Sequence, residues 1–235
     1  MINNLSVLAL ITARGGSKSV VGKNLRTIGD KSLIGWTMDA ARSSRYIDRI
    51  IISTDNQDII DHAKALGCEV PFMRPDYLAT DKASSLDVVR HAMEEEGRGY
   101  DLMVLLQPTS PFRRGEDIDA TIDRMFSVQA RTCITVCKAS KSPHWMFEIE
   151  DDGTMEPVVK METLNKATRR QDLPPVYVIN GAVYVAYIDD LLNGGKLMDK
   201  HTVAHIMSVR RSLDIDDEMD LKIAKALLDE VHDPL

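Results

Sequence analysis

The sequence lacks long apolar runs. No run approaches the roughly 20 residues that a helix needs to cross a bilayer. Basic residues are absent from residues 1–6, so no secretory signal is expected there. Cysteine is scarce: Cys68, Cys133 and Cys137 form an odd set without metal-ligand spacing. Together these features predict a cytoplasmic protein with no membrane segment and with buried, reduced thiols.

Positive charge is also in short supply. The 235 residues include 29 Lys and Arg against 36 Asp and Glu, which gives a net charge of −7. Nucleic-acid-binding proteins depend on basic surface, so this acidic chain is a poor candidate for that class. A small group of cationic side chains could still bind an anion.

The chain alternates between apolar runs and segments with helical spacing. Strands are predicted at residues 7–11, 49–54, 69–72, 102–106, 131–138, 182–187 and 204–209, and helices at residues 32–44, 56–66, 84–96 and 217–232. Apolar strands without alternation are typical of a mostly parallel sheet that helices cover on both faces. We expect one α/β domain over residues 1–235. Residues 140–180 are richer in proline and charge, which indicates an inserted flap or small subdomain.

The first segment with chemical content follows the first predicted strand. Residues 13–24 read ARGGSKSVVGKN and bring Arg14, Lys18 and Lys23 close together. Glycines allow a sharp turn that presents N–H groups to an anion, and ligands of open parallel sheets bind at the carboxyl ends of strands. The segment matches neither a Walker A loop nor a dinucleotide fingerprint. It predicts a polyphosphate site, the alternative being a solvated turn with scattered charge.

An acidic segment near the C-terminus is the second feature. Residues 212–220 read SLDIDDEMD. In an extended stretch Asp214 and Asp216 point the same way, which suits a hard divalent cation such as Mg²⁺. The alternative is that Asp216 or Asp217 caps the last helix.

A polar loop follows a middle strand. Residues 107–113 read QPTSPFR, in which two prolines fix the backbone and Gln, Thr and Ser supply neutral hydrogen bonds. Such groups suit sugar hydroxyls, although a plain rigid loop is the alternative. His201 and His205 have no metal-ligand context and are interpreted as incidental.

Taken in order, these segments resemble the acylneuraminate cytidylyltransferases, the family of CMP-sialic acid and CMP-legionaminic acid synthetases. The resemblance covers nearly the whole chain. It rests on ARGGSK at 13–18 with KN at 23–24, ISTD at 52–55, RP at 74–75, LATDKASS at 78–85, QPTSP at 107–111, RQ at 170–171, NGAVY at 180–184 and DID at 214–216.

The resemblance implies a fold, a reaction and a set of site residues. The fold would be a Rossmann-like three-layer sandwich, with a dimerisation and sugar-covering element within about 140–200. The reaction would transfer CMP from CTP to a nine-carbon 2-keto-3-deoxy sugar acid, releasing pyrophosphate, with Mg²⁺. The resemblance assigns the nucleotide to Arg14, Ser17, Lys18, Lys23, Asn24, Arg74, Ala83 and Ser85, the sugar to Gln107, Arg170, Gln171, Asn180 and Tyr184, the metal to Asp214 and Asp216, and catalysis to Arg14, Lys23 and Asp216.

The chain departs from the sialic acid pattern in two places. Residues 178–182 read VINGA where those enzymes resemble RPNGA, and residues 143–146 read PHWM where a lysine is expected nearby. Loss of two cations favours a less polar acceptor such as legionaminic acid, so N-acetylneuraminic and legionaminic acid both stay open. Pseudaminic acid or Kdo as acceptor, a different nucleoside triphosphate, and a non-catalytic nucleotide-binding module are the less favoured alternatives.

Overall fold

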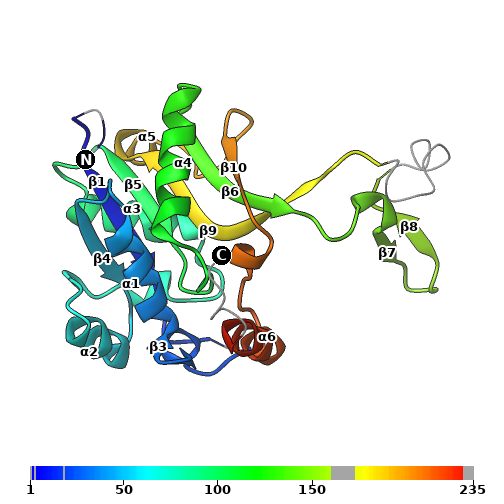
Figure 1. The fold of residues 1–235 in the computed structure, drawn as a ribbon, viewed down its shortest axis with the longest axis horizontal. Helices are drawn as coiled ribbons and strands as arrows, with labels where there is room; N and C mark the ends of the chain where they lie inside the picture. Colours follow the sequence, from blue (N-terminus) through cyan, green and yellow to red (C-terminus); the bar gives the residue numbers. More distant parts are fainter. Residues whose placement is uncertain (1, 3, 18, 160–172, 230–235) are drawn as a thin grey trace.

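A six-stranded sheet forms the centre of the computed structural model, which describes residues 2, 4–17, 19–159 and 173–229 (Figure 1). The strand order is β10-β6-β9-β5-β1-β4. Only β9 runs antiparallel to its neighbours in this sheet. The strands are β1 (Val7–Thr12), β4 (Arg49–Ser53), β5 (Leu102–Leu106), β6 (Thr132–Lys138), β9 (Tyr177–Tyr187) and β10 (Val203–Met207).

Helices cover both faces of the sheet. On one face lie α1 (Leu33–Ser43), α2 (Gln57–Ala65) and α4 (Gly115–Ser127), and on the other lie α3 (Ser85–Glu96) and α5 (Ile188–Leu192). Successive strand residues point to opposite faces. In β1, Val7, Ala9 and Ile11 therefore join the first layer's core, whereas Leu8 and Leu10 join the second. Because both faces of the central strands β1 and β5 are buried, these strands show no polar alternation. The predicted Rossmann-like three-layer sandwich is confirmed.

The last helix, α6 (Glu218–Asp229), packs outside these layers. A separate small core joins Ile215, Leu221 and Ala224 to Val20, Ile28 and Leu33. Ile28 belongs to a short hairpin of β2 (Thr27–Ile28) and β3 (Lys31–Ser32). This packing brings the acidic segment that precedes α6 against the loop that follows β1.

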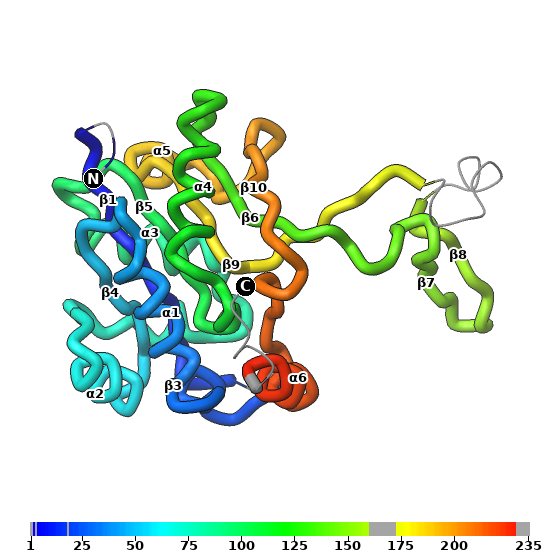
Figure 2. The backbone as a smooth tube through the Cα atoms, viewed as in Figure 1, coloured from blue at the N-terminus to red at the C-terminus, as the bar shows by residue number. Residues whose placement is uncertain are grey.

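The segment between β6 and β9 leaves the body of the protein as an arm (Figures 1 and 2). It contains a short helix, η3 (Pro143–Trp145), and a hairpin of β7 (Phe147–Ile149) and β8 (Met155–Pro157). Large apolar side chains are exposed on the arm and on the part of β9 that leads to it: Trp145, Met146, Phe147, Ile149, Met155, Val158, Tyr177, Val178 and Ile179. In its described part the arm consists of one short helix and a two-stranded hairpin, which is too little structure to bury these side chains.

The structure departs from the sequence predictions in three respects. The strand predicted at residues 69–72 is absent: Glu69 makes an isolated bridge to Ile51, and beyond Pro71 Met73 makes another to Thr54, because proline has no N–H for a ladder. Strand β9 begins at Tyr177, five residues earlier than predicted at Ala182. Helices α4 and α5 were not predicted. The four helices that were predicted agree within about two residues over the described chain, and Ser32, Asn56 and Ser84 cap the first three.

Candidate active site

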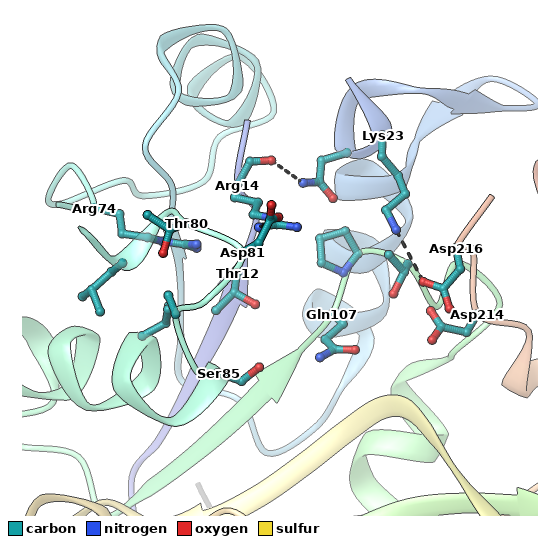
Figure 3. Close-up of a pocket in the computed structure, with 16 residues that line it drawn as sticks. Thr12, Arg14, Lys23, Arg74, Thr80, Asp81, Ser85, Gln107, Asp214 and Asp216 are labelled. Carbon is teal, nitrogen blue, oxygen red and sulfur yellow. Dashed lines mark hydrogen bonds and ion pairs between the residues drawn. The ribbon is translucent and has the colours of Figure 1, made fainter. Parts of the chain in front are cut away.

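A cavity of about 320 Å³ opens at the carboxyl ends of β1 and β5, where three loops meet (Figure 3). The loops follow β1, precede α3 and follow β5, and the segment before α6 closes the fourth side. The lining residues are Thr12, Arg14, Lys23, Asn24, Arg74, Leu78, Thr80, Asp81, Ala83, Ser85, Val88, Gln107, Pro108, Thr109, Asp214 and Asp216.

The loop after β1 is fixed against the neighbouring strand. The Gly15 N–H donates to Asp55 Oδ1 at 2.9 Å. A Cβ at Gly15 would lie 2.7 Å from the Asn56 Cβ, so this close approach requires glycine. Further along, the Asn24 amide donates to the Arg14 carbonyl at 2.9 Å and closes the loop on itself. The loop that presents Arg14 is therefore held in shape before any ligand binds.

Two arginines lie on one side of the cavity (Figure 3). Arg14 forms an ion pair of 2.7 Å with Asp81. Arg74 is buried, and its guanidinium donates to the Ser53 hydroxyl at 3.0 Å and to the Ser53 carbonyl. Burial lowers the pKa of Arg74 to about 10, an effect that Asp55 opposes. Arg74 therefore remains a cation at neutral pH and gives this side a fixed positive charge.

Lys23 lies on the opposite side, beside the acidic segment (Figure 3). Its ammonium donates to the Ile215 carbonyl at 2.9 Å and lies 3.6 Å from Asp216 Oδ1. The Lys23 side chain is only 15% exposed. Lys23 thus joins the loop after β1 to the chain between Asp214 and Asp216.

The acidic segment is extended, with Ile215 in the core between the two aspartates that line the cavity. The helix cap is a different residue. Asp217 Oδ1 accepts from the N–H groups of Met219 and Asp220, at 2.7 and 2.9 Å. Asp220 in return accepts from the Asp217 N–H at 3.0 Å, which completes a capping box. The Asp216 carboxylate is therefore free of any capping role.

Asp214 lies deeper than Asp216. Burial, with a smaller effect of Asp216, raises the pKa of Asp214, while Thr109 and Lys23 oppose the rise. Its Oδ1 atom is buried without a hydrogen-bond partner. An unpaired buried carboxylate oxygen is costly, and such an oxygen is a ligand that Mg²⁺ accepts. Across the described residues, no three His, Cys, Asp or Glu side chains form a metal site by themselves.

Gly181 brings the main chain of β9 close to Asp214 and Gln107. Its φ is +70°, and a Cβ there would lie 2.6 Å from Gln107 Oε1 and 3.6 Å from Asp214 Oδ2. Tyr184 lies on the same strand, half-buried; burial raises its pKa, and the nearby Asp214 charge adds to the rise. The main chain of β9 and the loop after β5 therefore lie together beside Asp214.

Most of the residues predicted for the site line one cavity: Arg14, Lys23, Asn24, Arg74, Ala83, Ser85, Gln107, Asp214 and Asp216. Ser17 lies in the loop after β1 but does not line the cavity, and Tyr184 flanks it. Asn180 is buried beneath it. Lys18, Arg170 and Gln171 lie outside the described residues. The binding roles of these residues stay predictions.

Sequence reasoning missed several residues of the site. Thr12, Thr80, Asp81 and Thr109 line the cavity, and Gly181 supports it. The sequence could have identified three of them by position. Thr12 follows the first predicted strand, Asp81 lies in the LATDKASS segment, and Thr109 lies in the QPTSP loop. The ion pair between Arg14 and Asp81, however, joins residues that no sequence pattern connects.

Solved structures share this architecture. A CMP-2-keto-3-deoxy-manno-octonic acid synthetase complexed with CTP superposes with a TM-score of 0.72 at 16% identity, covering 96% of this chain and 99% of that one. A 4-diphosphocytidyl-2C-methyl-D-erythritol synthase from Anaerococcus prevotii gives 0.68, also at 16% identity, over 97% of this chain and 98% of that one. At this identity the similarity shows the fold alone.

Sequence comparisons are more specific. A flagellin modification protein B of Campylobacter coli is 34% identical over 95% of both chains. A CMP-N,N′-diacetyllegionaminic acid synthase of Legionella pneumophila is 31% identical over 96% of this chain and 97% of its own. An N-acylneuraminate cytidylyltransferase of Escherichia coli is 31% identical over 93% of this chain and 51% of its own. With residues 8–209 also matching the family model, the chain belongs to the cytidylyltransferase family.

Proposed function

We propose that this protein transfers the cytidylyl group of CTP to the anomeric hydroxyl of a nine-carbon 2-keto-3-deoxy sugar acid, N-acetylneuraminic or legionaminic acid, and releases pyrophosphate. The observation that carries the proposal is the arrangement of charge in one cavity. Arg14 and Lys23 face it from a fixed loop, and Asp214 and Asp216 face it from the segment before α6, beside Lys23. A nucleoside triphosphate needs such cations, and a divalent ion on its phosphates needs such carboxylates.

The reaction is a single displacement at the α-phosphorus. The anomeric oxygen of the sugar acid forms the new P–O bond as the bond to pyrophosphate breaks, and the hydroxyl proton leaves to a base. Asp216 is the base in this proposal, because its carboxylate is exposed to the cavity and caps no helix. Arg14 and Lys23 hold the phosphates and stabilise the charge that develops on the leaving group.

Asp214 and Asp216 would hold Mg²⁺ together with the phosphates of CTP. The fit rests on the unpaired Asp214 Oδ1 and on the position of both aspartates in the lining of one cavity. When bound, the ion supplies charge neutralisation at the α-phosphate. The Lys23 ammonium lies 3.6 Å from the Asp216 carboxylate. When that carboxylate binds a cation, Lys23 would be released to bind a phosphate.

The nucleotide and sugar would occupy different ends of the cavity. Arg74, Ala83 and Ser85 lie on the side of α3 and suit the ribose and base, with Asn24 holding the loop. Gln107 and Tyr184 lie on the side of β9 and suit the sugar acid. The names of the relatives from Legionella and E. coli support both acceptors. Because CTP is an intracellular nucleotide, we place the reaction in the cytoplasm.

The active form is proposed to be a homodimer. The arm extends away from the body of its own chain (Figure 2). Trp145, Phe147 and Ile149 on the arm are exposed. Exposed apolar patches of this kind mark protein interfaces. A second copy of the chain would cover these side chains, and the arm would reach over the sugar end of that copy's cavity.

A substrate panel tests the function. The purified protein is given CTP, UTP, ATP or GTP with each of sialic, legionaminic, pseudaminic and Kdo acids, and pyrophosphate release is measured with Mg²⁺ and with EDTA. We expect release only with CTP, Mg²⁺ and sialic or legionaminic acid. Pyrophosphate release with another nucleotide, or only with pseudaminic or Kdo acid, would contradict the proposal and identify the alternative.

A further inference from the structure

The side-chain amide of Asn180 is turned into the protein, where it is 4% exposed. An amide has two N–H donors and an oxygen with two lone pairs. Oδ1 accepts from the Thr135 hydroxyl at 2.6 Å and from the Ala182 N–H at 3.2 Å. Nδ2 donates to Ser212 Oγ at 2.8 Å and to Met207 Sδ at 3.3 Å. All four positions are used, so none is left for a sugar hydroxyl.

The direction of these hydrogen bonds follows from the partners. The backbone N–H of Ala182 can only donate, which identifies the atom facing it as the amide oxygen. The Ser212 hydroxyl donates its single proton to the Ser208 carbonyl at 2.8 Å. Ser212 must therefore accept from Asn180, and the amide cannot be flipped without losing both contacts.

Asn180 occupies an irregular part of the sheet. The register between β6 and β9 shifts between Ile134 and Val136, where the Thr135 hydroxyl replaces ladder hydrogen bonds. Bulges of this kind re-aim neighbouring residues near active sites. Here the bulge includes Gly181, whose main chain approaches both Gln107 and Asp214.

The contact with Ser212 leads directly to the acidic segment. Ser212 is buried in η6 (Arg210–Ser212) and precedes Asp214 by two residues. On the other side of Asp214, the Ile215 N–H donates to the Thr109 carbonyl at 2.9 Å. The chain that carries Asp214 is thus held at two points, and Asn180 supplies the first through Ser212.

We propose that Asn180 is a positioning residue for the carboxylates of Asp214 and Asp216, and that it makes no contact with the acceptor sugar. The inference rests on the proposed function, because it concerns the metal that these carboxylates would hold. Its consequence is specific: loss of the contact between Asn180 and Ser212 weakens cation binding and leaves the affinity for the sugar acid unchanged.

The test compares Ser212→Ala, Asn180→Ala and the double variant with the wild type. Mn²⁺ binding in the presence of CTP is measured by electron paramagnetic resonance, and the KM of the sugar acid by pyrophosphate release. We expect each single variant to raise the dissociation constant of Mn²⁺ about threefold to tenfold, the effect of one buried hydrogen bond. The double variant should bind Mn²⁺ no more weakly than either single variant, because each single substitution already removes the same contact.

Thr132→Val is the matched control for stability. Thr132 is buried, and its hydroxyl shares a hydrogen bond of 2.8 Å with the Thr202 hydroxyl at the amino ends of β6 and β10, the ends away from the acidic segment. It should lower the melting temperature without changing Mn²⁺ binding. If Asn180→Ala does not fold, Ser212→Ala alone decides, because Ser212 does not line the cavity.

Two results separate this inference from the proposed function. Normal Mn²⁺ binding in Ser212→Ala would overturn the inference, because the contact between Asn180 and Ser212 would then not position the carboxylates. A raised KM of the sugar acid in Asn180→Ala at normal Mn²⁺ affinity would also overturn it, because Asn180 would then act on the sugar. If the wild type neither binds Mn²⁺ with CTP nor forms product, the proposed function fails first and the inference with it.

Discussion

The Lys23 ammonium lies between the Ile215 carbonyl, at 2.9 Å, and the Asp216 carboxylate, at 3.6 Å. One cation therefore touches both the main chain and a side chain of the acidic segment. Since Lys23 also begins η1 (Lys23–Leu25), the loop after β1 and the acidic segment are linked without a ligand. Substitutions on either side of this link should have separable effects on turnover and stability.

Removing the loop cations should reduce catalysis strongly. Lys23→Ala and Arg14→Ala are each expected to lower kcat/KM about 100-fold, the usual effect of losing a preorganised charge. Steady-state kinetics with CTP as the varied substrate measure this. Lys31→Ala is the control, because Lys31 also forms an ion pair, with Asp39, but lies outside the cavity.

The two loop cations should differ in stability. Arg14 is partly exposed, so its removal should leave the melting temperature unchanged. Lys23 is largely buried and donates to Ile215, so Lys23→Ala should lose about 1 kcal/mol, or roughly 2–4 °C. Near-normal turnover in both variants would refute the phosphate role of the loop.

Asp214 should make the free protein less stable as the pH rises. Burial raises its pKa, so the fold favours the protonated form and loses stability as the pH passes upward through that raised value. Asp214→Asn in EDTA should therefore melt about 2 °C higher than the wild type at pH 8. The difference should shrink as the pH falls toward the ordinary carboxyl range, where both forms are neutral. Scanning calorimetry at several pH values checks this; a pH-independent difference would contradict it.

Acceptor choice should depend on Val178. Its side chain is exposed where β9 leaves the sheet toward the arm, two residues before Asn180. Val178→Arg supplies a cation that the sialic acid enzymes are expected to carry, so it should raise the kcat/KM for sialic acid relative to legionaminic acid. Val158→Arg, also exposed on the arm, is the control for charge alone. An unchanged ratio would place selectivity elsewhere.

The arm should hold the dimer together. Ile149 and Met155 face each other across the β7–β8 hairpin, and both are exposed. Changing both to Glu places like charges on an apolar surface and should shift the protein toward monomer, which light scattering after size-exclusion chromatography detects. Ile223→Glu on exposed α6 is the control. An unchanged dimer would exclude the hairpin as the interface, and a monomeric wild type would refute the dimer.

The central strands of the sheet were predictable because they are buried on both faces. Residues 102–106 match β5 without any shift, since an apolar run of this length is typical of a buried strand and short for a helix. Helix α4 was missed although Ile118, Ile122 and Met125 recur at helical spacing. The N-cap residue of α4 is Arg114, which is not one of the residue types typical of that position. The carboxylate of Asp117, in the first turn, instead accepts from the Arg114 N–H. The sequence therefore gives little sign of where this helix begins.

The site was predictable as separate segments, and less so as geometry. Nothing in the sequence around Lys23 indicates burial, yet its side chain is largely buried because α6 packs its preceding segment against the loop. That packing joins residues about 190 positions apart. Similarly, Asn180 reads as a polar residue of a sugar-binding motif, and only the tertiary structure shows that its amide is fully occupied.

The last prediction concerns two neighbouring aspartates with opposite roles. The Asp216 side chain is 80% exposed and caps no helix, whereas Asp217 accepts from Met219 and Asp220 at the start of α6. Asp216→Asn should therefore lose most of kcat and require more Mg²⁺, at an almost unchanged melting temperature. Asp217→Ala should do the reverse, losing about 1 kcal/mol of stability while it keeps turnover.

Kinetics over a range of Mg²⁺ concentrations and thermal melts measure both variants. The comparison is decisive because the two changes are adjacent in sequence and each removes one carboxylate, so a general loss of negative charge would affect them equally. Wild-type turnover by Asp216→Asn at ordinary Mg²⁺ would remove Asp216 from the metal site and from catalysis. A matching loss of turnover in Asp217→Ala would instead show that activity depends on the start of α6 and not on the Asp216 carboxylate.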